Sequence, residues 1–423
     1  MRSSRFATLA ASAFVVLAFA EPVVAQSETV AYRGATVWSD GQFAPRDLLV
    51  RDGRFVDDGE PVRTVDLAGT FVVPAYANAH AHITNPDRET SDYFLRNGVF
   101  YVWNTGSVVM DSKLRRFFAR PDTYDVKFAF GAITEPGGHP EKLYVDILTQ
   151  YVYPGKPREW FDGNAFHYGR TDEEVDAALA LLDAQGADFV KAILVFSEDY
   201  DLRRDDPEFY GMKGMGPSRV LHLVDAAKRI GKPVAFHVES VEDLLAAASA
   251  GGFMAAHLPG YGYKEPGEDL ATITLSPMDA KLVAASGMLL VPTYSLAKVS
   301  YAADPAPAAR SIALHFAAQA SNLRQLDRAG ARFAIGTDQQ GEIFTEVEHL
   351  ASLSAFDDRK LLWIVLETGS KLFPERRIGC FEPGCEADFL ALSEDPSCDL
   401  TALRKIVLAV KGGIRLAFVA STD

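Results

Sequence analysis

The chain has 423 residues, of which 48% are hydrophobic, so it can bury a large core over two or three domains. Its 57 acidic residues outnumber 42 lysines and arginines, and the formal net charge is −15 at pH 7. This balance excludes the basic footprint that a nucleic-acid partner or an anionic membrane surface requires.

The N-terminal residues are typical of a cleaved signal peptide. Two arginines precede an apolar stretch from Phe6 to Ala20, and Val23-Val24-Ala25 follows it. An uncleaved membrane anchor is the alternative, but the apolar run is shorter than the about 20 residues that a spanning helix needs. We therefore predict that residues 1–25 are removed, leaving a periplasmic or secreted protein without a membrane span.

Both ends of the remaining chain predict short strands. Residues 26–73 alternate apolar and polar side chains around Asp40-Gly41 and Asp52-Gly53, dipeptides that favour hairpins. A few short strands bury little surface, so they need partner strands from elsewhere. Residues 378–423 supply the candidates IGCFEPG, ADFLALS and KIVLAVKGGIRLAF. We predict that the two terminal segments pair into one composite β-sandwich.

Residues 74–377 alternate short apolar runs with amphipathic helices. The runs lie at 98–103, 126–133, 187–196, 233–238, 253–257, 288–293 and 332–337. The predicted helices include 172–185, 217–230, 241–250 and 315–329, and a helix-rich segment follows around 345–372. With a further strand near residue 80 there are eight apolar runs. This number of strand–helix units predicts a closed (β/α)8 barrel of the TIM type, with its chemistry at the C-terminal ends of the strands.

Two histidines separated by one residue, His80 and His82, end the first of these strands. Period-two alternation puts both on one face, where two imidazoles can bind one metal ion. On its own, such a pair is more often solvated or packed in a core than bound to a metal. Whether this pair binds a metal therefore depends on which residues lie at the other strand ends.

Four more metal-competent residues follow successive strands. Lys191 lies in the fourth strand, and the ends of the fifth, sixth and eighth carry His237, His257 and Asp338. Each has an ordinary explanation, such as a lysine with a buried stem or an aspartate that caps a helix. Because all of them lie at the same end of successive strands, together they indicate one metal site at the barrel mouth.

At this point the mature chain resembles the amidohydrolase superfamily of metal-dependent hydrolases, in the imidazolonepropionase-like and prolidase-like branch. The resemblance rests on His80-Ala81-His82, ADFVKAIL, AFHVES, AAHLPGYG, AIGTD and the C-terminal IGCFEPGCEADFLAL. It implies a distorted barrel with a composite sandwich. It also implies two divalent metal ions, with zinc favoured, bridged by a carboxylated Lys191.

In that arrangement His80, His82 and Asp338 surround one metal, and His237 and His257 the other. If Lys191 is unmodified, a single-metal site of the histidines and Asp338 is the alternative. The chain departs from the family at Asn78, where aspartate is usual, and at Ala75, where glycine is usual. Neither is a metal ligand in the family pattern, so we expect altered support rather than a lost site.

The resemblance implies hydrolysis of an amide or peptide-like C–N bond in a small substrate, such as an N-acyl amino acid or dipeptide, by a metal-activated hydroxide. Asp338 would orient the nucleophile and pass a proton to the leaving nitrogen. Ester, lactone or phosphotriester hydrolysis on the same site is the second hypothesis, and a non-catalytic exported binding protein is the third. Homo-oligomerisation stays open.

The loop after the third strand is a candidate cover for the barrel mouth. We expect His139 within it, together with Tyr144, Tyr151 and Tyr294, to contact substrate. The other histidines are assigned to surface or packing roles: His167, His222, His315 and His349.

Three cysteines lie near the C-terminus: Cys380, Cys385 and Cys398. Export permits one disulfide and leaves one thiol over, and the Glu-Pro-Gly turn between Cys380 and Cys385 could bring those two together. The sequence does not choose the pair.

Overall fold

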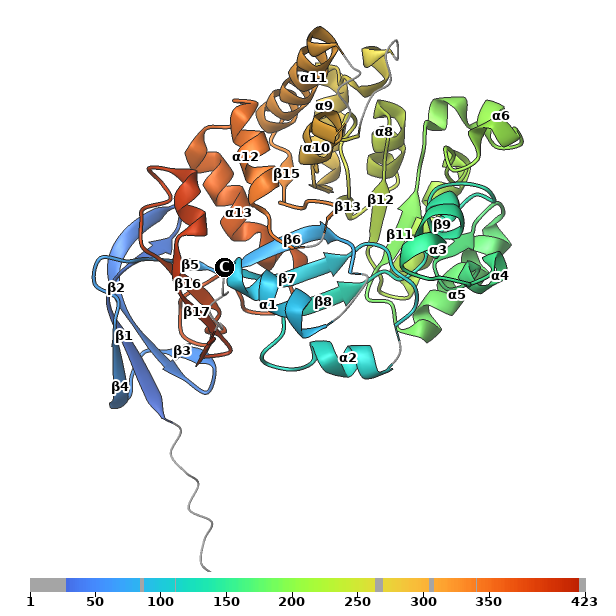
Figure 1. The fold of residues 1–423 in the computed structure, drawn as a ribbon. Helices are drawn as coiled ribbons and strands as arrows, with labels where there is room; N and C mark the ends of the chain where they lie inside the picture. The colour runs from blue at the N-terminus through green and yellow to red at the C-terminus, as the bar shows by residue number, and fades with distance from the viewer. Residues whose placement is uncertain are drawn as a thin grey trace, which may run out of the picture.

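The computed structural model describes residues 28–83, 87–110, 112–262, 269–303, 308–339 and 341–417. The predicted signal peptide at residues 1–25 lies outside these ranges. Among the described residues, no helix is long and apolar enough to cross a bilayer. In Figure 1 a sheet built from both ends of the chain, coloured blue and red, lies beside a larger body in which helices surround parallel strands.

The two ends of the chain form one eight-stranded sheet of order β18-β17-β16-β5-β1-β2-β3, with β4 pairing β1. Strand β5 joins the halves, because it runs parallel to β1 on one side and antiparallel to β16 on the other. The two terminal segments therefore pair as predicted, within a single sheet, and the sandwich stays a prediction. The strands are β1 Thr29–Ser39, β2 Gln42–Arg51, β3 Arg54–Val56, β4 Pro61–Asp66, β5 Phe71–Pro74, β16 Phe389–Leu392, β17 Ile406–Lys411 and β18 Ile414–Arg415.

Both predicted hairpins are present. Asp40 and Gly41 have φ of 49° and 79°, and Asp52 and Gly53 have φ of 51° and 75°. Two successive residues with positive φ are the mark of a type I′ turn, which matches the twist of the strands it joins. The turns set the pairs Ser39↔Gln42 and Arg51↔Arg54.

The strand predicted at IGCFEPG is wrong, because residues 378–384 run as turns and bends. Pro383 cannot donate to a strand ladder, and Gly384 has a φ of 83°. A disulfide joins Cys380 to Cys385 and closes this loop, while Cys398 is free and exposed.

The remaining strands are parallel and form two sheets. One has three strands in the order β6-β7-β8, and the other has seven in the order β10-β9-β11-β12-β13-β14-β15. The run predicted at 126–133 divides into β8 and β9, because Phe130 between them has a φ of 57°. The strands are β6 Tyr76–Ala81, β7 Val99–Asn104, β8 Asp125–Phe128, β9 Ala132–Thr134, β10 Phe166–Tyr168, β11 Val190–Ile193, β12 Val234–His237, β13 Met254–Ala255, β14 Leu289–Leu290 and β15 Arg332–Phe333.

The predicted helices are present with small changes of boundary. Helix α5 spans the predicted range because Thr171 caps its first turn and Gly186, at a φ of 77°, ends it. The α-helices are α1 Arg88–Arg96, α2 Ser112–Phe118, α3 Thr149–Tyr151, α4 Arg158–Phe161, α5 Asp172–Gln185, α6 Tyr200–Arg203, α7 Val220–Arg229, α8 Val241–Ser249, α9 Pro277–Ser286, α10 Ser295–Ala303, α11 Ala309–Arg328, α12 Phe344–Ser352 and α13 Asp358–Leu372. A π-helix, η1 Leu143–Leu148, and short 3₁₀ turns, η2 Ser197–Asp199, η3 Pro207–Phe209, η4 Pro217–Arg219, η5 Leu270–Ile273 and η6 Leu400–Arg404, complete the elements.

The chain after β15 lies directly against β6. The Ala79 amide donates to the Ile335 carbonyl at 2.8 Å, and the Asp338 amide donates to the His80 carbonyl at 2.8 Å. Gly336 permits this close approach, because a Cβ there would lie 2.7 Å from the His80 nitrogen. The contact fixes Asp338 beside His80 through backbone bonds alone.

A buried glutamate holds the start of α10. Glu346 on α12 accepts hydrogen bonds from the amides of Tyr294 and Ser295 at 3.0 and 2.7 Å. These are among the amides that a helix leaves without an internal partner. Burial raises the pKa of Glu346 from 4.5 to about 7, against the lowering effect of those two bonds.

We expect this carboxyl to make stability depend on pH. The folded protein keeps the proton to about pH 7 whereas the unfolded chain loses it near 4.5, so the contribution to the free energy of unfolding falls as pH rises through this window. A glutamine side chain cannot titrate, so the free energy of unfolding of Glu346→Gln should fall less between pH 5 and 7.5 than that of the wild type. The difference between the two decreases should be at most about 3 kcal/mol. Urea unfolding at both pH values measures it, with the exposed Glu348→Gln on the same helix as the control. Parallel pH curves for wild type and Glu346→Gln would contradict the assignment.

Candidate metal centre and cavity

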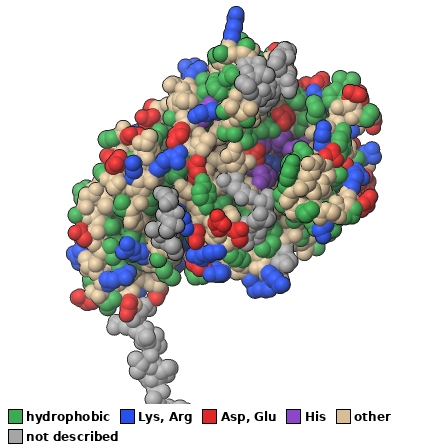
Figure 2. All heavy atoms as spheres, in the orientation of Figure 1, with side chains coloured by type: hydrophobic (Ala, Val, Ile, Leu, Met, Phe, Trp, Pro, Cys, Tyr) green, Lys and Arg blue, Asp and Glu red, His purple; other side chains and the backbone are tan. Residues whose placement is uncertain are grey.

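The strand ends bring the predicted metal ligands together. His80 lies on β6 with His82 directly after it, Lys191 lies within β11, and His237 ends β12. His257 and Asp338 lie a few residues beyond β13 and β15. All six line one cavity of about 290 Å³. Figure 2 shows histidine side chains at the bottom of a hollow on this face of the molecule.

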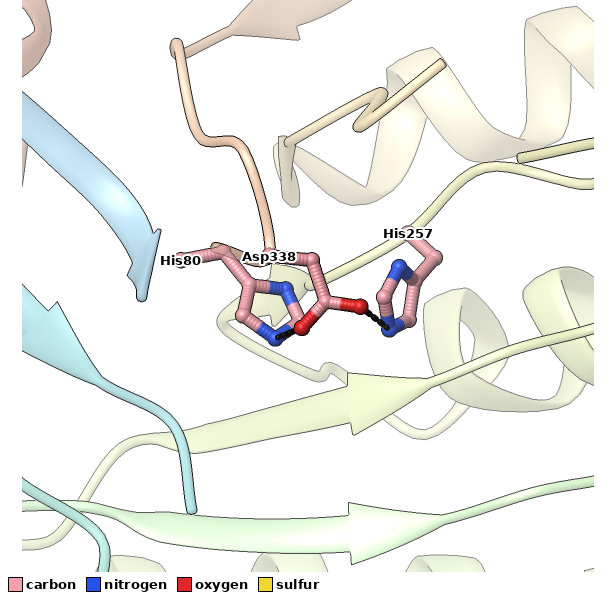
Figure 3. A group of neighbouring side chains, drawn as sticks. All are labelled: His80, His257 and Asp338. Atoms are coloured by element: carbon pink, nitrogen blue, oxygen red, sulfur yellow. Dashed lines mark ion pairs between the residues drawn. The ribbon is translucent and has the colours of Figure 1, made fainter. Parts of the chain in front are cut away.

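Asp338 is the centre of the group. Its Oδ1 lies 2.9 Å from His80 Nε2 and 2.8 Å from His82 Nε2, and its Oδ2 lies 3.9 Å from His257 Nε2. Figure 3 shows the imidazoles of His80 and His257 on either side of the carboxylate. Asp338 has a φ of 56°, an uncommon backbone conformation that is concentrated at functional sites.

Hydrogen bonds on the far side of each ring fix which nitrogen carries the proton. His80 Nδ1 lies 2.7 Å from the Ala256 carbonyl, and His82 Nδ1 lies 2.8 Å from the Gly106 carbonyl. A carbonyl only accepts, so both rings donate from Nδ1 and present a lone pair at Nε2.

His257 is fixed in the same way by a hydroxyl. Its Nδ1 lies 2.8 Å from Thr293 Oγ1, and that hydroxyl donates its own proton to the Pro292 carbonyl. Thr293 must therefore accept from His257, and the third Nε2 lone pair also faces Asp338. Hydrogen bonds of this kind orient metal-binding histidines.

These acceptors converge with no donor between them. Burial lowers the pKa of His80 to about 4, and it lowers the pKa of His257 well below its usual value, so neither of these two buried rings supplies a proton. Lone pairs 2.8–3.3 Å apart repel unless a cation lies among them. The donor set therefore fits a divalent metal ion that accepts imidazole and carboxylate ligands.

His237 extends the site through partners that the sequence analysis did not identify. Its Nε2 donates to Glu239 Oε1 at 3.0 Å, and the Tyr261 hydroxyl donates to the same oxygen at 2.8 Å. Tyr261 also stacks on His257, with ring centroids 3.8 Å apart. Glu239 follows His237 by two residues and Tyr261 follows His257 by four. That proximity to the strand ends is the signal that could have identified them.

Lys191 is buried beside this group, and its Nζ has no hydrogen-bond partner among the described residues. Burial lowers the pKa of Lys191 to about 7, against the raising effect of Asp338. Its amine is therefore largely neutral near physiological pH.

The predicted substrate contacts divide into two pairs. His139 and Tyr144 line the cavity, and the His139 ring stacks on His237 at 4.7 Å between centroids. Tyr151 is 75% exposed and lies outside the lining, because it follows the π-helix on its solvent side. Tyr294 is fully buried, and its hydroxyl donates to the Pro259 carbonyl. The expectation of substrate contact is therefore corrected for Tyr151 and Tyr294.

The four histidines assigned to surface or packing roles all lie outside the cavity lining. His222 pairs with Asp176 at 2.9 Å near the surface. His315 and His349 belong to a buried polar network with Gln319, and His167 is buried on β10.

Asn78 supports the centre without contacting it. Its Oδ1 accepts from the amides of His80 and Thr337 at 3.1 and 3.3 Å, and its Nδ2 donates to Thr337 Oγ1 at 2.9 Å. One buried side chain thus holds together the two segments that carry His80 and Asp338. Whether this support differs from that of the usual aspartate stays a prediction.

The fold resembles solved structures over almost its full length. The A. niger ochratoxinase structure has a TM-score of 0.72 at 18% identity, covering 93% of this chain and 97% of that one. A Xaa-Pro dipeptidase with bound methionine in the active site has a TM-score of 0.71 at 17% identity, covering 92% and 100%. Phenylurea hydrolase B has a TM-score of 0.66 at 18% identity, covering 92% and 97%. Identities this low establish the shared fold alone.

The fold is of the α/β class, and its donor set fits a divalent metal ion. The model of the amidohydrolase family matches residues 207–415, and the chain belongs to the amidohydrolase superfamily. It is therefore a hydrolase. A search of proteins with curated functions found no match.

We expect Asn78→Ala to weaken metal binding by about 10–100-fold, because losing a residue that supports metal ligands has that effect. Asn78→Asp keeps an acceptor for both amides, and the Thr337 hydroxyl can donate to it, so this variant should retain most of the affinity. Competition with a chromophoric chelator measures both. Equal affinity of wild type and Asn78→Ala would show that the side chain does not support the centre.

Proposed function

We propose that this chain hydrolyses the amide C–N bond of a small substrate at the cavity lined by the six predicted ligands. The observation that carries the proposal is the convergence of three Nε2 lone pairs on the Asp338 carboxylate. Among the similar structures, one is titled a Xaa-Pro dipeptidase and another a phenylurea hydrolase. A bound divalent metal would supply a hydroxide nucleophile near neutral pH and polarise the scissile carbonyl.

The residues then have separate roles. His80 and His82, with Asp338, would hold one metal, and His237 and His257 would hold a second. Asp338 would also take a proton from the attacking water and deliver it to the leaving nitrogen. The Tyr261 hydroxyl and the His139 ring line the same cavity and would orient the substrate carbonyl.

Lys191 would bridge the two metals as a carbamate. A lysine ammonium at this place would repel cations, whereas a carbamate supplies anionic oxygen. Carbamate formation needs the neutral amine, and the lowered pKa of Lys191 makes that form available. If Lys191 stays unmodified, one metal bound by the histidines and Asp338 remains.

We further propose that the two parallel sheets are parts of one distorted (β/α)8 barrel. The bonds from Ala79 to Ile335 and from Asp338 to His80 support closure at one junction. At the other junction, the Asp188 amide donates to the Phe128 carbonyl at 2.7 Å. Closure would explain why ligands from six places in the chain face one point. Export after cleavage of residues 1–25 remains part of the proposal.

Metal content tests the bridge. Protein purified without chelators should carry about two equivalents per chain, and Lys191→Ala should carry one or fewer, because the bridging ligand is lost. Lys213→Ala is the matched control, since Lys213 is also buried but its Nζ donates to the Arg204 carbonyl outside the cavity. About one equivalent in the wild type, unchanged in Lys191→Ala, would exclude the bimetal arrangement.

Asp338→Asn should lower kcat for an amide substrate by about 10²–10⁴-fold, because asparagine cannot accept the proton. The exposed Asp358→Asn is the matched control and should keep wild-type activity. Metal content measured on the same samples separates a lost proton acceptor from a lost ligand. Wild-type activity in Asp338→Asn would contradict the assigned role.

A further inference from the structure

The cavity has two unlike sides. The metal-binding side carries imidazoles, Lys191 and a carboxylate. Much of the remaining lining is apolar or aromatic, and we call six of these residues the η1 wall: Pro140, Leu143, Tyr144, Leu148, Tyr153 and Ala165. The non-reacting part of a substrate bound at the metal-binding residues would pack against this wall.

The π-helix η1 supplies half of the residues of this wall. Hydrogen bonds in a π-helix join residues five apart, so Leu143 and Leu148 fall on the same face. Tyr144, next to them, packs on Phe161 with ring centroids 5.8 Å apart. Phe161 belongs to a separate buried cluster with Ala165 and Phe166. The wall is therefore a packed apolar surface.

No cation faces the wall from the described residues of the lining, in which Lys191 is the only lysine or arginine. The cations on the neighbouring segments have other partners. Arg158 pairs with the buried Glu141, and Arg170 pairs with Glu135 at 3.1 Å. The Nζ atoms of Lys142 and Lys156 lie over the rings of Tyr210 and Trp160. The Tyr153 hydroxyl stays neutral, because burial raises its pKa. A carboxylate pressed against the wall would lose its hydration without gaining an ion pair, which is costly.

We infer that the preferred substrate is a small neutral amide whose apolar or aryl group rests on the η1 wall, rather than an amide that carries a free carboxylate there. This inference rests on the proposed amide hydrolysis and narrows it, since N-acyl amino acids and dipeptides are charged. The cavity of about 290 Å³ lies at the lower end of the range of ligand pockets, so the substrate is small.

Three amides with the same acyl group test the preference: butyranilide, para-butyramidobenzamide and para-butyramidobenzoate. The benzamide and the benzoate have nearly the same size and differ in charge. We expect kcat/KM for the benzoate to be lower than for the benzamide by about tenfold or more, because a buried charge is left unpaired. Equal or faster cleavage of the benzoate would overturn the inference and leave amide hydrolysis intact.

Leu148→Arg places a cation on the wall and should reverse the order, raising kcat/KM for the benzoate relative to the benzamide by about 100-fold. Leu202→Arg is the matched control, since Leu202 is 64% exposed on α6 and lies outside the lining. An unchanged ratio in Leu148→Arg would also overturn the inference.

If none of the three amides is cleaved, the proposed function fails, and binding still decides the substrate class. Calorimetry should then find tighter binding of the benzamide than of the benzoate, with the order reversed in Leu148→Arg. Tighter binding of the benzoate to the wild type would overturn the inference.

Discussion

The site depends on one constraint, which is that acceptor groups with no proton to share are held against one another. The chain accepts this arrangement because backbone bonds impose it. The amide of Asp338 is bound to the carbonyl of His80, and each histidine is anchored on its far side to a carbonyl or to Thr293. A bound cation would relieve the repulsion. Metal binding and folding would then be linked, since a ligand that binds only the folded state stabilises it.

The same constraint explains how supporting residues are distributed. Asn78 ties the segment of His80 to that of Asp338 with three hydrogen bonds and contacts neither carboxylate nor imidazole side chain. Glu346 supports the site less directly. It binds the amides at the start of α10, which directly follow Thr293, the residue that orients His257. Polar groups buried in this way are satisfied by backbone amides, so the core around the site keeps its geometry without a bound ligand.

The sequence predicted those features that follow from local pattern. Hairpins at Asp-Gly, the capped helix α5 and the placement of His80, His237 and Lys191 on strands come from periodicity and turn chemistry. Other features were missed. The IGCFEPG segment is rich in apolar residues, but Pro383 and the left-handed conformation of Gly384 make it a loop. Tyr294 lies near a strand end, but it is buried and its hydroxyl donates to the distant Pro259 carbonyl. The π-helix that brings Leu143 and Leu148 together has no sequence signature, because its extra residue per turn is set by packing.

The sheet shared by the two ends of the chain governs the order of folding. Strand β5 is complete only when β16 lies beside it, yet β5 ends at Pro74 and β16 begins only at Phe389. During synthesis, the edge of β5 that will bind β16 stays without its partner until almost the whole chain has emerged. An unpaired strand edge of this kind promotes aggregation. The nascent protein is therefore exposed to aggregation at this edge for longer than a fold with contiguous domains would be.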